Sequence, residues 1–241
     1  MAYTTINNPS EYFNTKLFTG NGSTQSISSV GFQPDWVWLK GRSGSDRDHL
    51  LFDAIRGATN YIKSNATSAE ATISSTLTSF DSDGFSIGSN SGVNTNSETF
   101  VSWNWLANGA GVSNTDGDIT STVSASTTSG FSIVKYTGTA SNATVGHGLG
   151  VKPAMMIAKN LDNGSEDWCV YHKSLGYNNV LKLNSSNAIL TATNRWNAEP
   201  DTNVFNVGTA AEANGSGANQ IAYVFAENPL VGTNNIPATA R

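Results

Sequence analysis

Histidine is the side chain most often used for metal binding and for proton transfer near neutral pH, and the chain has three. His49 and His172 lie in or beside expected strands, and His147 lies in the turn-like sequence "VGHGLG". None has a second histidine or a carboxylate at metal-ligand spacing on a regular element. The pattern predicts structural histidines at strand edges and turns, and no metal centre.

Paired carboxylates could hydrolyse a glycosidic bond. Three pairs occur in expected turns, and none is repeated elsewhere in the chain: Asp81 with Asp83, Glu166 with Asp167, and Asp116 with Asp118. The sequences "DSDG" and "NTDGD" also resemble parts of calcium-binding loops, but they lack the downstream bidentate Glu. Because Asp and Asn cap their own backbone in turns, we interpret these residues as turn formers. We therefore expect neither catalysis nor a cofactor, with calcium kept as an alternative.

The composition narrows the class of protein. Of 241 residues only 13% are charged, the net charge is −5, and Lys and Arg form no dense patch of the kind that binds nucleic acid. The single cysteine, Cys169, excludes an internal disulfide, and its apolar neighbours predict a buried thiol. No secretory signal and no apolar run of membrane-spanning length is present. We expect a protein made in a cytoplasm, without a membrane span.

Aromatic residues are the remaining candidates for binding. Trp36, Trp38, Trp103 and Trp105 fall in expected strands, so we interpret them as core residues. Trp196 lies in the loop "TNRWNAEP", where it could stack on a sugar, fill a partner's pocket or cover the core. Two loops could contact a ligand or a partner, through Arg42 and Arg47 in the first and Arg195, Trp196 and Asn197 in the second.

These candidates sit on a chain that repeats itself. Pro34 corresponds to Pro153 and Lys40 to Lys159, 119 residues apart in both cases. "LFTG" (17–20) matches "KYTG" (135–138) at 118 residues, and "FVSWNW" (100–105) matches "QIAYVF" (220–225) at 120. Offsets that drift by one residue at turns are typical of a tandem duplication.

Within each copy the hydrophobic period is two. In "TFVSWNWLA" the side chains of Val101, Trp103 and Trp105 share one face. Apolar residues on both faces of "DWVWLK" (35–40) predict a central strand, and "DSDG" (81–84) predicts a hairpin turn. Turn-bounded runs give seven or eight short strands per copy, the spacing of a β-sandwich.

The predicted fold is all-β, with two tandem duplicated antiparallel β-sandwich domains of jelly-roll or lectin-like type. The expected boundaries are residues 1–109 for the first copy, 110–117 for a linker, 118–228 for the second copy, and 229–241 for a C-terminal arm. One large sandwich, with half supplied by each copy, is the alternative; the Gly/Asn-rich linker favours two domains.

Three stretches carry a family resemblance: "LFTGNGSTQSISSVGFQPDWVWLKGRS", "DGFSIGS" followed by "FVSWNWLANG", and "TSTVSASTTSGFSIVKYTGT…VGHGLGVKP". From about Tyr3 to Pro229, the chain resembles structural proteins of marine tailed bacteriophages. The resemblance implies tandem concanavalin/laminin-G-like sandwich modules in tail-fibre-like or virion surface proteins, often trimeric. It transfers no catalytic or binding residues. The chain has no coiled coil or stalk of the kind found in long fibres, which favours a compact decoration, knob or adaptor.

The resemblance leads to three functional expectations. The first is a non-catalytic virion structural protein on the surface of the phage particle, on the head or the tail, with other virion proteins and copies of itself as partners. The second is a lectin-like receptor-binding module whose loops contact host glycans. The third, least favoured, is a polysaccharide-degrading enzyme. In the first, "NNIPATAR" (234–241) at the C-terminus could anchor the chain by adding a strand to a neighbour.

Overall fold

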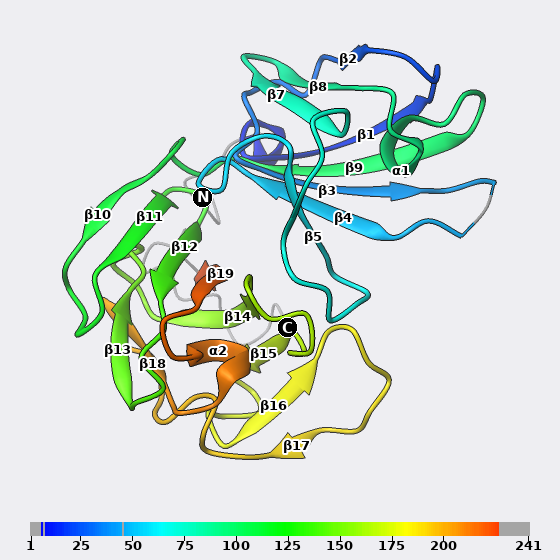
Figure 1. Cartoon of the computed structure of the whole chain (residues 1–241). Helices are drawn as coiled ribbons and strands as arrows, with labels where there is room; N and C mark the ends of the chain where they lie inside the picture. Colours follow the sequence, from blue (N-terminus) through cyan, green and yellow to red (C-terminus); the bar gives the residue numbers. More distant parts are fainter. Residues whose placement is uncertain (1–5, 7, 45, 227–241) are drawn as a thin grey trace, which may run out of the picture.

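The computed structural model describes residues 6, 8–44 and 46–226, and it shows an all-β, sandwich-like protein (Figure 1). The strands of each sheet pair in antiparallel fashion throughout this part of the chain. Among its helices, none is long and apolar enough to cross a membrane. The expected arm, 229–241, lies outside the described residues.

The first half forms two sheets. The larger has six strands, in the order β1 (Phe13–Thr19), β9 (Thr99–Trp105), β3 (Trp36–Gly41), β4 (His49–Asp53), β5 (Asn60–Lys63) and β6 (Ala71–Thr72). The smaller has three, in the order β2 (Gln25–Ile27), β8 (Gly84–Ile87) and β7 (Leu77–Asp81). Two short helices, η1 (Pro9–Glu11) and α1 (Ser91–Asn94), precede β1 and β9. The predicted hairpin is confirmed, since β7 and β8 pair through Asp81 and Gly84.

The second half follows the same plan. Its larger sheet has eight strands, in the order β10 (Val112–Asn114), β11 (Ser121–Ser126), β12 (Phe131–Thr137), β19 (Asn219–Ala226), β14 (Pro153–Asn160), β15 (Cys169–His172), β16 (Asn179–Lys182) and β17 (Leu190–Thr191). From β12 to β17 this is the order that runs from β1 to β6 in the first half. The smaller sheet pairs β13 (Ala143–Gly146) with β18 (Val204–Val207), and α2 (Ala211–Asn214) precedes β19 as α1 precedes β9.

Two differences separate the halves. Part of the segment expected to be a linker, 110–117, forms β10, which pairs with β11, and these two strands extend the larger sheet of the second half without a counterpart among the described strands of the first. Strand β7 has no counterpart among the strands of the second half. The four-residue helices α1 and α2 were not expected, because so short a helix leaves no periodic pattern in the sequence.

A buried asparagine fixes the same loops in both halves. The side-chain amide of Asn94 donates to the carbonyl groups of Gly88 and Ser23, and its oxygen accepts the backbone N–H of Asn21. Asn214, 120 residues later, makes the same set of bonds at the corresponding positions. Both side chains are fully buried. Because an amide supplies two donors and an acceptor, it can satisfy several loop backbone groups at once.

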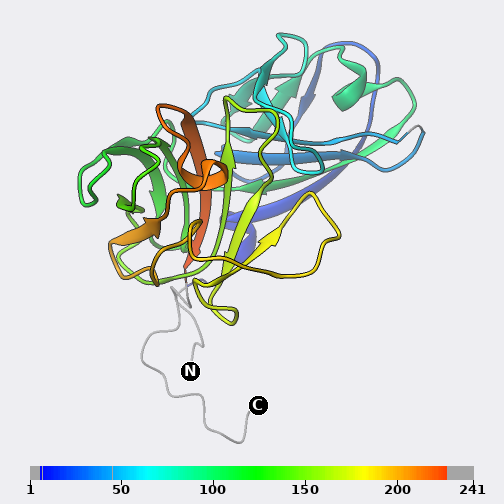
Figure 2. The same cartoon turned by 60° about the horizontal axis from the view of Figure 1, so that its bottom comes forward.

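The side chains pack into three cores. One lies between the six-stranded and three-stranded sheets, and a second lies between the eight-stranded sheet and the β13–β18 pair. The third joins the halves, because it contains side chains from both large sheets, such as Trp36 and Leu51 from the first and Phe131 and Tyr223 from the second. Figure 2 shows the halves as two lobes in contact. The halves therefore share a core in addition to the core that each has of its own.

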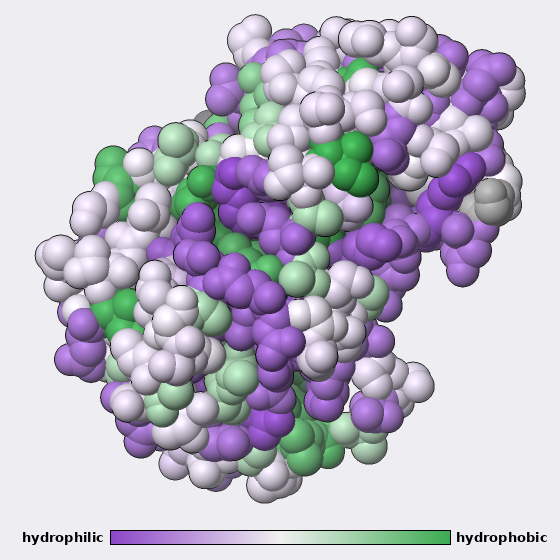
Figure 3. Space-filling view, viewed as in Figure 1, coloured by the Kyte–Doolittle hydropathy of each residue, from purple (hydrophilic) through white to green (hydrophobic). Residues whose placement is uncertain are grey.

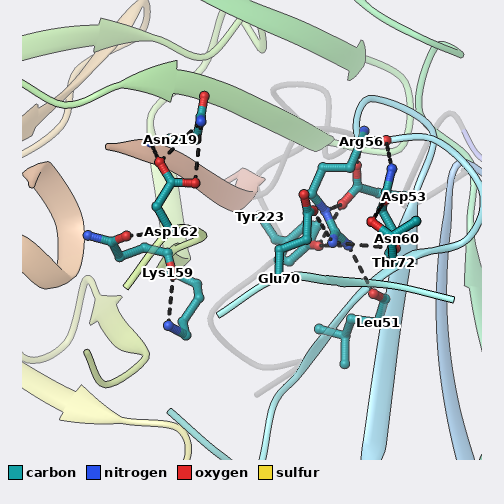
Figure 4. A network of polar contacts seen from close by, with 11 residues as sticks. Leu51, Asp53, Arg56, Asn60, Glu70, Thr72, Lys159, Asp162, Asn219 and Tyr223 are labelled. Carbon is teal, nitrogen blue, oxygen red and sulfur yellow. Dashed lines mark hydrogen bonds and ion pairs between the residues drawn. The ribbon is translucent and has the colours of Figure 1, made fainter. Parts of the chain in front are cut away.

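Tyr223 is the main contact across the central core. Its ring stacks on Trp36 with centroids 4.2 Å apart and planes 21° apart. Its hydroxyl donates to Asp53 at 2.8 Å and accepts from Arg56 at 3.3 Å (Figure 4). A second bond between the halves runs from the Trp168 indole N–H to the carbonyl of Lys63.

Arg56 is fully buried at this boundary. Its guanidinium donates to the carboxylates of Asp53 and Glu70 and to the carbonyl of Leu51, besides the hydroxyl of Tyr223 (Figure 4). Burial opposes the charge and lowers the pKa of Arg56, but Asp53, Tyr223 and Glu70 outweigh it and raise that pKa above its ordinary value. The charge is therefore stable only while its partners, including one from the second half, remain in place.

Replacing Arg56 should destabilise the whole molecule. We expect Arg56→Leu, which introduces the residue found 119 positions later at Leu175, to lower the free energy of unfolding by about 3–5 kcal/mol, because it leaves the Asp53 carboxylate buried and unpaired. The double variant Asp53→Asn/Arg56→Leu should recover a large part of this loss, since it removes both charges. Urea unfolding measures both variants. A single variant within about 1 kcal/mol of the original chain would contradict this role for the ion pair.

Candidate functional site

An aromatic groove lies on the part of the six-stranded sheet that the second half leaves uncovered. It is lined by Trp38 on β3, His49 on β4, and Trp103 and Trp105 on β9, and its volume is about 310 Å³. These four side chains are partly exposed, whereas Trp36, two residues before Trp38 on the same strand, is buried. The groove begins where the central core ends, because Trp38 and Trp105 also pack against that core.

The rings of the groove stand edge to face. The Trp38 and Trp103 centroids are 6.2 Å apart with planes at 75°, and those of Trp38 and His49 are 5.8 Å apart at 77°. The indole N–H of Trp38 donates to Nδ1 of His49 at 2.9 Å. Nδ1 must therefore be unprotonated, which places the proton of the neutral imidazole on Nε2. This hydrogen bond holds the Trp38 ring in a fixed orientation.

The groove is apolar and has a lysine–aspartate ion pair at its edge. No carboxylate is among its lining residues. Lys40, two residues after Trp38 on β3, donates to the carbonyl of Arg47 and lies 3.6 Å from Asp46. Burial lowers the pKa of His49, and the Lys40 charge lowers it further. The imidazole is therefore uncharged at neutral pH, which keeps the groove apolar.

The residues of the second half that correspond to the groove residues are buried in the central core. Ile157 and Trp168 lie 119 residues after Trp38 and His49, and Tyr223 lies 120 residues after Trp103. All three are buried and belong to the core that joins the halves. The same sheet face thus contacts protein in the second half and remains partly open in the first. The interpretation of all four strand tryptophans as core residues holds fully for Trp36 alone.

The second half has an uncovered apolar surface of its own. Four side chains on and beside the β16–β17 hairpin are exposed by more than a third: Leu181, Leu183, Ile189 and Leu190. Figure 3 shows an apolar patch over this hairpin, at the bottom of the view. We call these four residues the hairpin patch.

The loop arginines that we predicted as contacts differ in their availability. Arg42 is exposed directly after β3. Arg47 makes two hydrogen bonds to the carboxylate of Glu98, at 3.0 and 3.2 Å, and Arg195 pairs with Glu212. Both pairs are largely shielded from solvent, so these two arginines hold loops together in the folded chain.

The prediction that Trp196 contacts a ligand or partner at the surface is wrong. Trp196 is fully buried and packs edge to face against Tyr171 and Phe205, which is the core role that the sequence left open. Asn197 beside it is partly buried. Sequence comparison could have found this, because Trp196 lies 119 residues after Leu77, a buried residue at the start of β7. The tryptophan occupies the core position that β7 supplies in the first half.

Each member of the three carboxylate pairs accepts hydrogen bonds from nearby groups of the chain. Asp83 accepts two backbone N–H groups of the loop after β2, and Asp81 accepts two serine hydroxyls. Asp167 binds Lys182 and Asn184. The others accept as follows: Glu166 from Asn163, Asp116 from Asn114, and Asp118 from Thr144. Within the described residues, no three His, Cys, Asp or Glu side chains gather as a metal site would require.

His147 and Cys169 are buried structural residues. Nδ1 of His147 accepts the backbone N–H of Leu149, and its Nε2 lies 3.3 Å from the carbonyl oxygen of Asp201. Burial lowers the pKa of His147. Cys169 is a free thiol whose pKa is raised by burial, so the predicted buried cysteine is confirmed. His172, whose Nδ1 accepts the backbone N–H of Ser174, also has a structural bond.

The stability of the protein should fall as the pH drops below 6.5. The pKa values of His49 and His147 lie below the ordinary value of 6.5 in the folded chain. The unfolded chain therefore takes up these protons first, so the stabilisation is complete above pH 6.5 and is lost as the pH falls through the folded pKa values. Urea midpoints at pH 7.5 and 5.5 measure this. His147→Asn should reduce the dependence; an unchanged dependence would contradict the assignment.

Comparison with known proteins places the chain in one family. None of the curated proteins matches the chain. No solved structure matches it either. A family model described as a domain of unknown function, DUF7483, matches residues 8–231, which is nearly the whole chain and includes every residue of the groove. The chain therefore belongs to the DUF7483 family.

Proposed function

We propose that the chain is a non-catalytic bacteriophage virion structural protein displayed on the particle surface, as a tail fibre or tail-associated component or as a head decoration or knob. The observation that carries the proposal is that the features common to both halves are structural. They are the strand order, the asparagines that fix loops, and an ion pair in each half. The carboxylate pairs that could have been catalytic make hydrogen bonds within local turns and loops. A protein that repeats its architecture without a shared reactive cluster suits a particle component better than an enzyme.

We also infer that the halves are two tandem duplicated antiparallel β-sandwich domains. A repeated ion-pair group supports this in detail. Asp48 accepts from Lys63 and Asn65 in the first half, and Asp167 accepts from two residues of the same types, each 119 residues later, in the second. The conserved strand order from β1 to β6 and from β12 to β17 supports the same origin.

The expected partners are other virion proteins and copies of the chain, in a homo-oligomer for which the resemblance suggests a trimer. The hairpin patch favours such a contact, because its four exposed aliphatic side chains would lose their water-facing surface in an interface. It lies at the edge of the eight-stranded sheet, where no other strand of the described residues pairs with the outer side of β17. An edge strand of this kind can pair with a neighbouring chain.

A lectin-like receptor-binding module is the second candidate function. The observation that favours it is the aromatic groove, whose rings are partly exposed and held in a fixed orientation. The predicted glycan-contacting loops around Arg47 and Trp196 support it less, because their side chains are paired or buried. The two functions are compatible, since a surface protein of a particle can also contact the host.

Particle labelling tests the main proposal. Antibodies against the chain should label intact purified particles of the encoding phage in electron micrographs, at one repeated position on the head or tail. Quantitative mass spectrometry of the same particles should give a fixed ratio of this chain to the major capsid protein. Particles that carry neither label nor peptides after a high-salt wash would contradict the proposal. A non-structural protein of the same phage serves as the control for carry-over.

A further inference from the structure

The geometry points to the aromatic groove of Trp38, His49, Trp103 and Trp105 as a binding site for a pyranose ring of a polysaccharide. This inference rests on the second candidate function, since it names the ligand class and the residues that would bind it. It moves the site away from the loops of Arg42 and Arg195 and onto the open face of the six-stranded sheet.

The groove offers flat apolar surfaces. A pyranose ring presents C–H groups on its faces and hydroxyl groups around its edge. The face of an indole ring carries partial negative charge, so it attracts the slightly positive C–H groups while both surfaces leave water. Trp38 and Trp103 stand at 75° to each other, so a ring stacked on one would be bounded by the other. The volume of about 310 Å³ is at the small end for ligand pockets, which suits a single ring with its substituents.

Polar groups at the groove can meet the hydroxyls of such a ligand. Throughout the described residues, the indole N–H groups of Trp103 and Trp105 have no hydrogen-bond partner, and neither is among the buried atoms left unsatisfied. Each can therefore donate to a hydroxyl oxygen. The indole N–H of Trp38 is already used by His49, so this ring supplies stacking surface alone.

The charges at the groove disfavour a cationic ligand. Perpendicular aromatic rings are also the usual binding site of quaternary ammonium groups. Such sites gain from nearby carboxylates, but none lines this groove, and Lys40 stands next to Trp38 on the same strand face. Lys40 is itself paired with Asp46 at 3.6 Å, so this edge of the groove supplies no unpaired carboxylate for a cation, and a neutral sugar needs none.

In the second half, the corresponding face of the large sheet is covered by the first half of the chain. There Trp168 donates its indole N–H to the carbonyl of Lys63, and the hydroxyl of Tyr223 bonds to Asp53 and Arg56. The polar atoms of both of these aromatic side chains are thus matched by groups of the first half. The groove instead keeps two unmatched N–H groups beside bare ring surface, which favours a ligand rich in hydroxyls.

Titration of the full chain with defined hexasaccharides tests the site. The probes are cellohexaose, laminarihexaose, chitohexaose and maltohexaose, and the readouts are tryptophan fluorescence and calorimetry. At least one should bind saturably. Trp103→Ala should weaken its binding about tenfold or more, through loss of a stacking surface and an N–H donor, and Trp103→Phe should weaken it less. Val112→Ala, which truncates an exposed apolar side chain on β10, should leave binding unchanged.

Four outcomes would overturn the inference. The first three are no binding of any hexasaccharide at millimolar concentration, binding that Trp103→Ala leaves unchanged while circular dichroism shows the variant folded, and saturable binding of choline without binding of sugars. Self-association of the chain that Trp103→Ala abolishes, with no sugar bound, would assign the groove to a second copy and also overturn it. Because the titration uses purified chain, its failure leaves the particle-labelling result untouched.

Discussion

The buried guanidinium of Arg56 is the interaction on which the arrangement of the two halves depends. An arginine has five N–H donors in one plane and cannot lose its charge in a protein. Here those donors face two carboxylates, two carbonyl oxygens and one hydroxyl, and the hydroxyl belongs to Tyr223 in the second half. Sliding one large sheet over the other would separate Tyr223 from this site and leave charge unpaired in an apolar core. The ion pair thereby sets the position at which the sheets pack.

That position leaves part of one sheet open. The second half covers Trp36, Leu51 and Ile62, touches Trp38 only in part, and stops short of Trp103 on the same face. In the second half the equivalent face is buried as far as Tyr223, and the uncovered part is shifted to the hairpin patch. Two similar sheets therefore expose different residues, because each covers only part of the other. The aromatic groove is therefore open in the first half, whereas Ile157, Trp168 and Tyr223 are buried in the second.

Periodicity and self-similarity predicted the all-β class, the central strand at Trp36–Gly41, the hairpin at 81–84 and the buried Cys169. These depend on local pattern, which a sequence contains. The packing of one half on the other is not contained in local pattern, so the strand positions of Trp38, Trp103 and Trp105 did not reveal that these side chains are partly exposed. The loop position of Trp196 was misleading for a related reason, since a missing strand lets a loop residue fill the core. The sequence did not reveal the role of Arg56. Its partners Glu70 and Tyr223 are distant along the chain, and Asp53 three residues before it forms no recognisable motif with it.

Equilibrium unfolding tests the central claim, that the halves form one unit around a shared core. Tryptophan fluorescence reports mainly on the first half and the central core, where Trp36, Trp38, Trp103, Trp105 and Trp168 lie, whereas far-ultraviolet circular dichroism reports on the strands of both halves. When urea is added, the two signals should change in a single coincident transition. Unfolding of either half would expose the central core and remove partners of the buried Arg56 charge. Two separated transitions, with the dichroism half lost while the fluorescence is intact, would show independent domains and contradict the account.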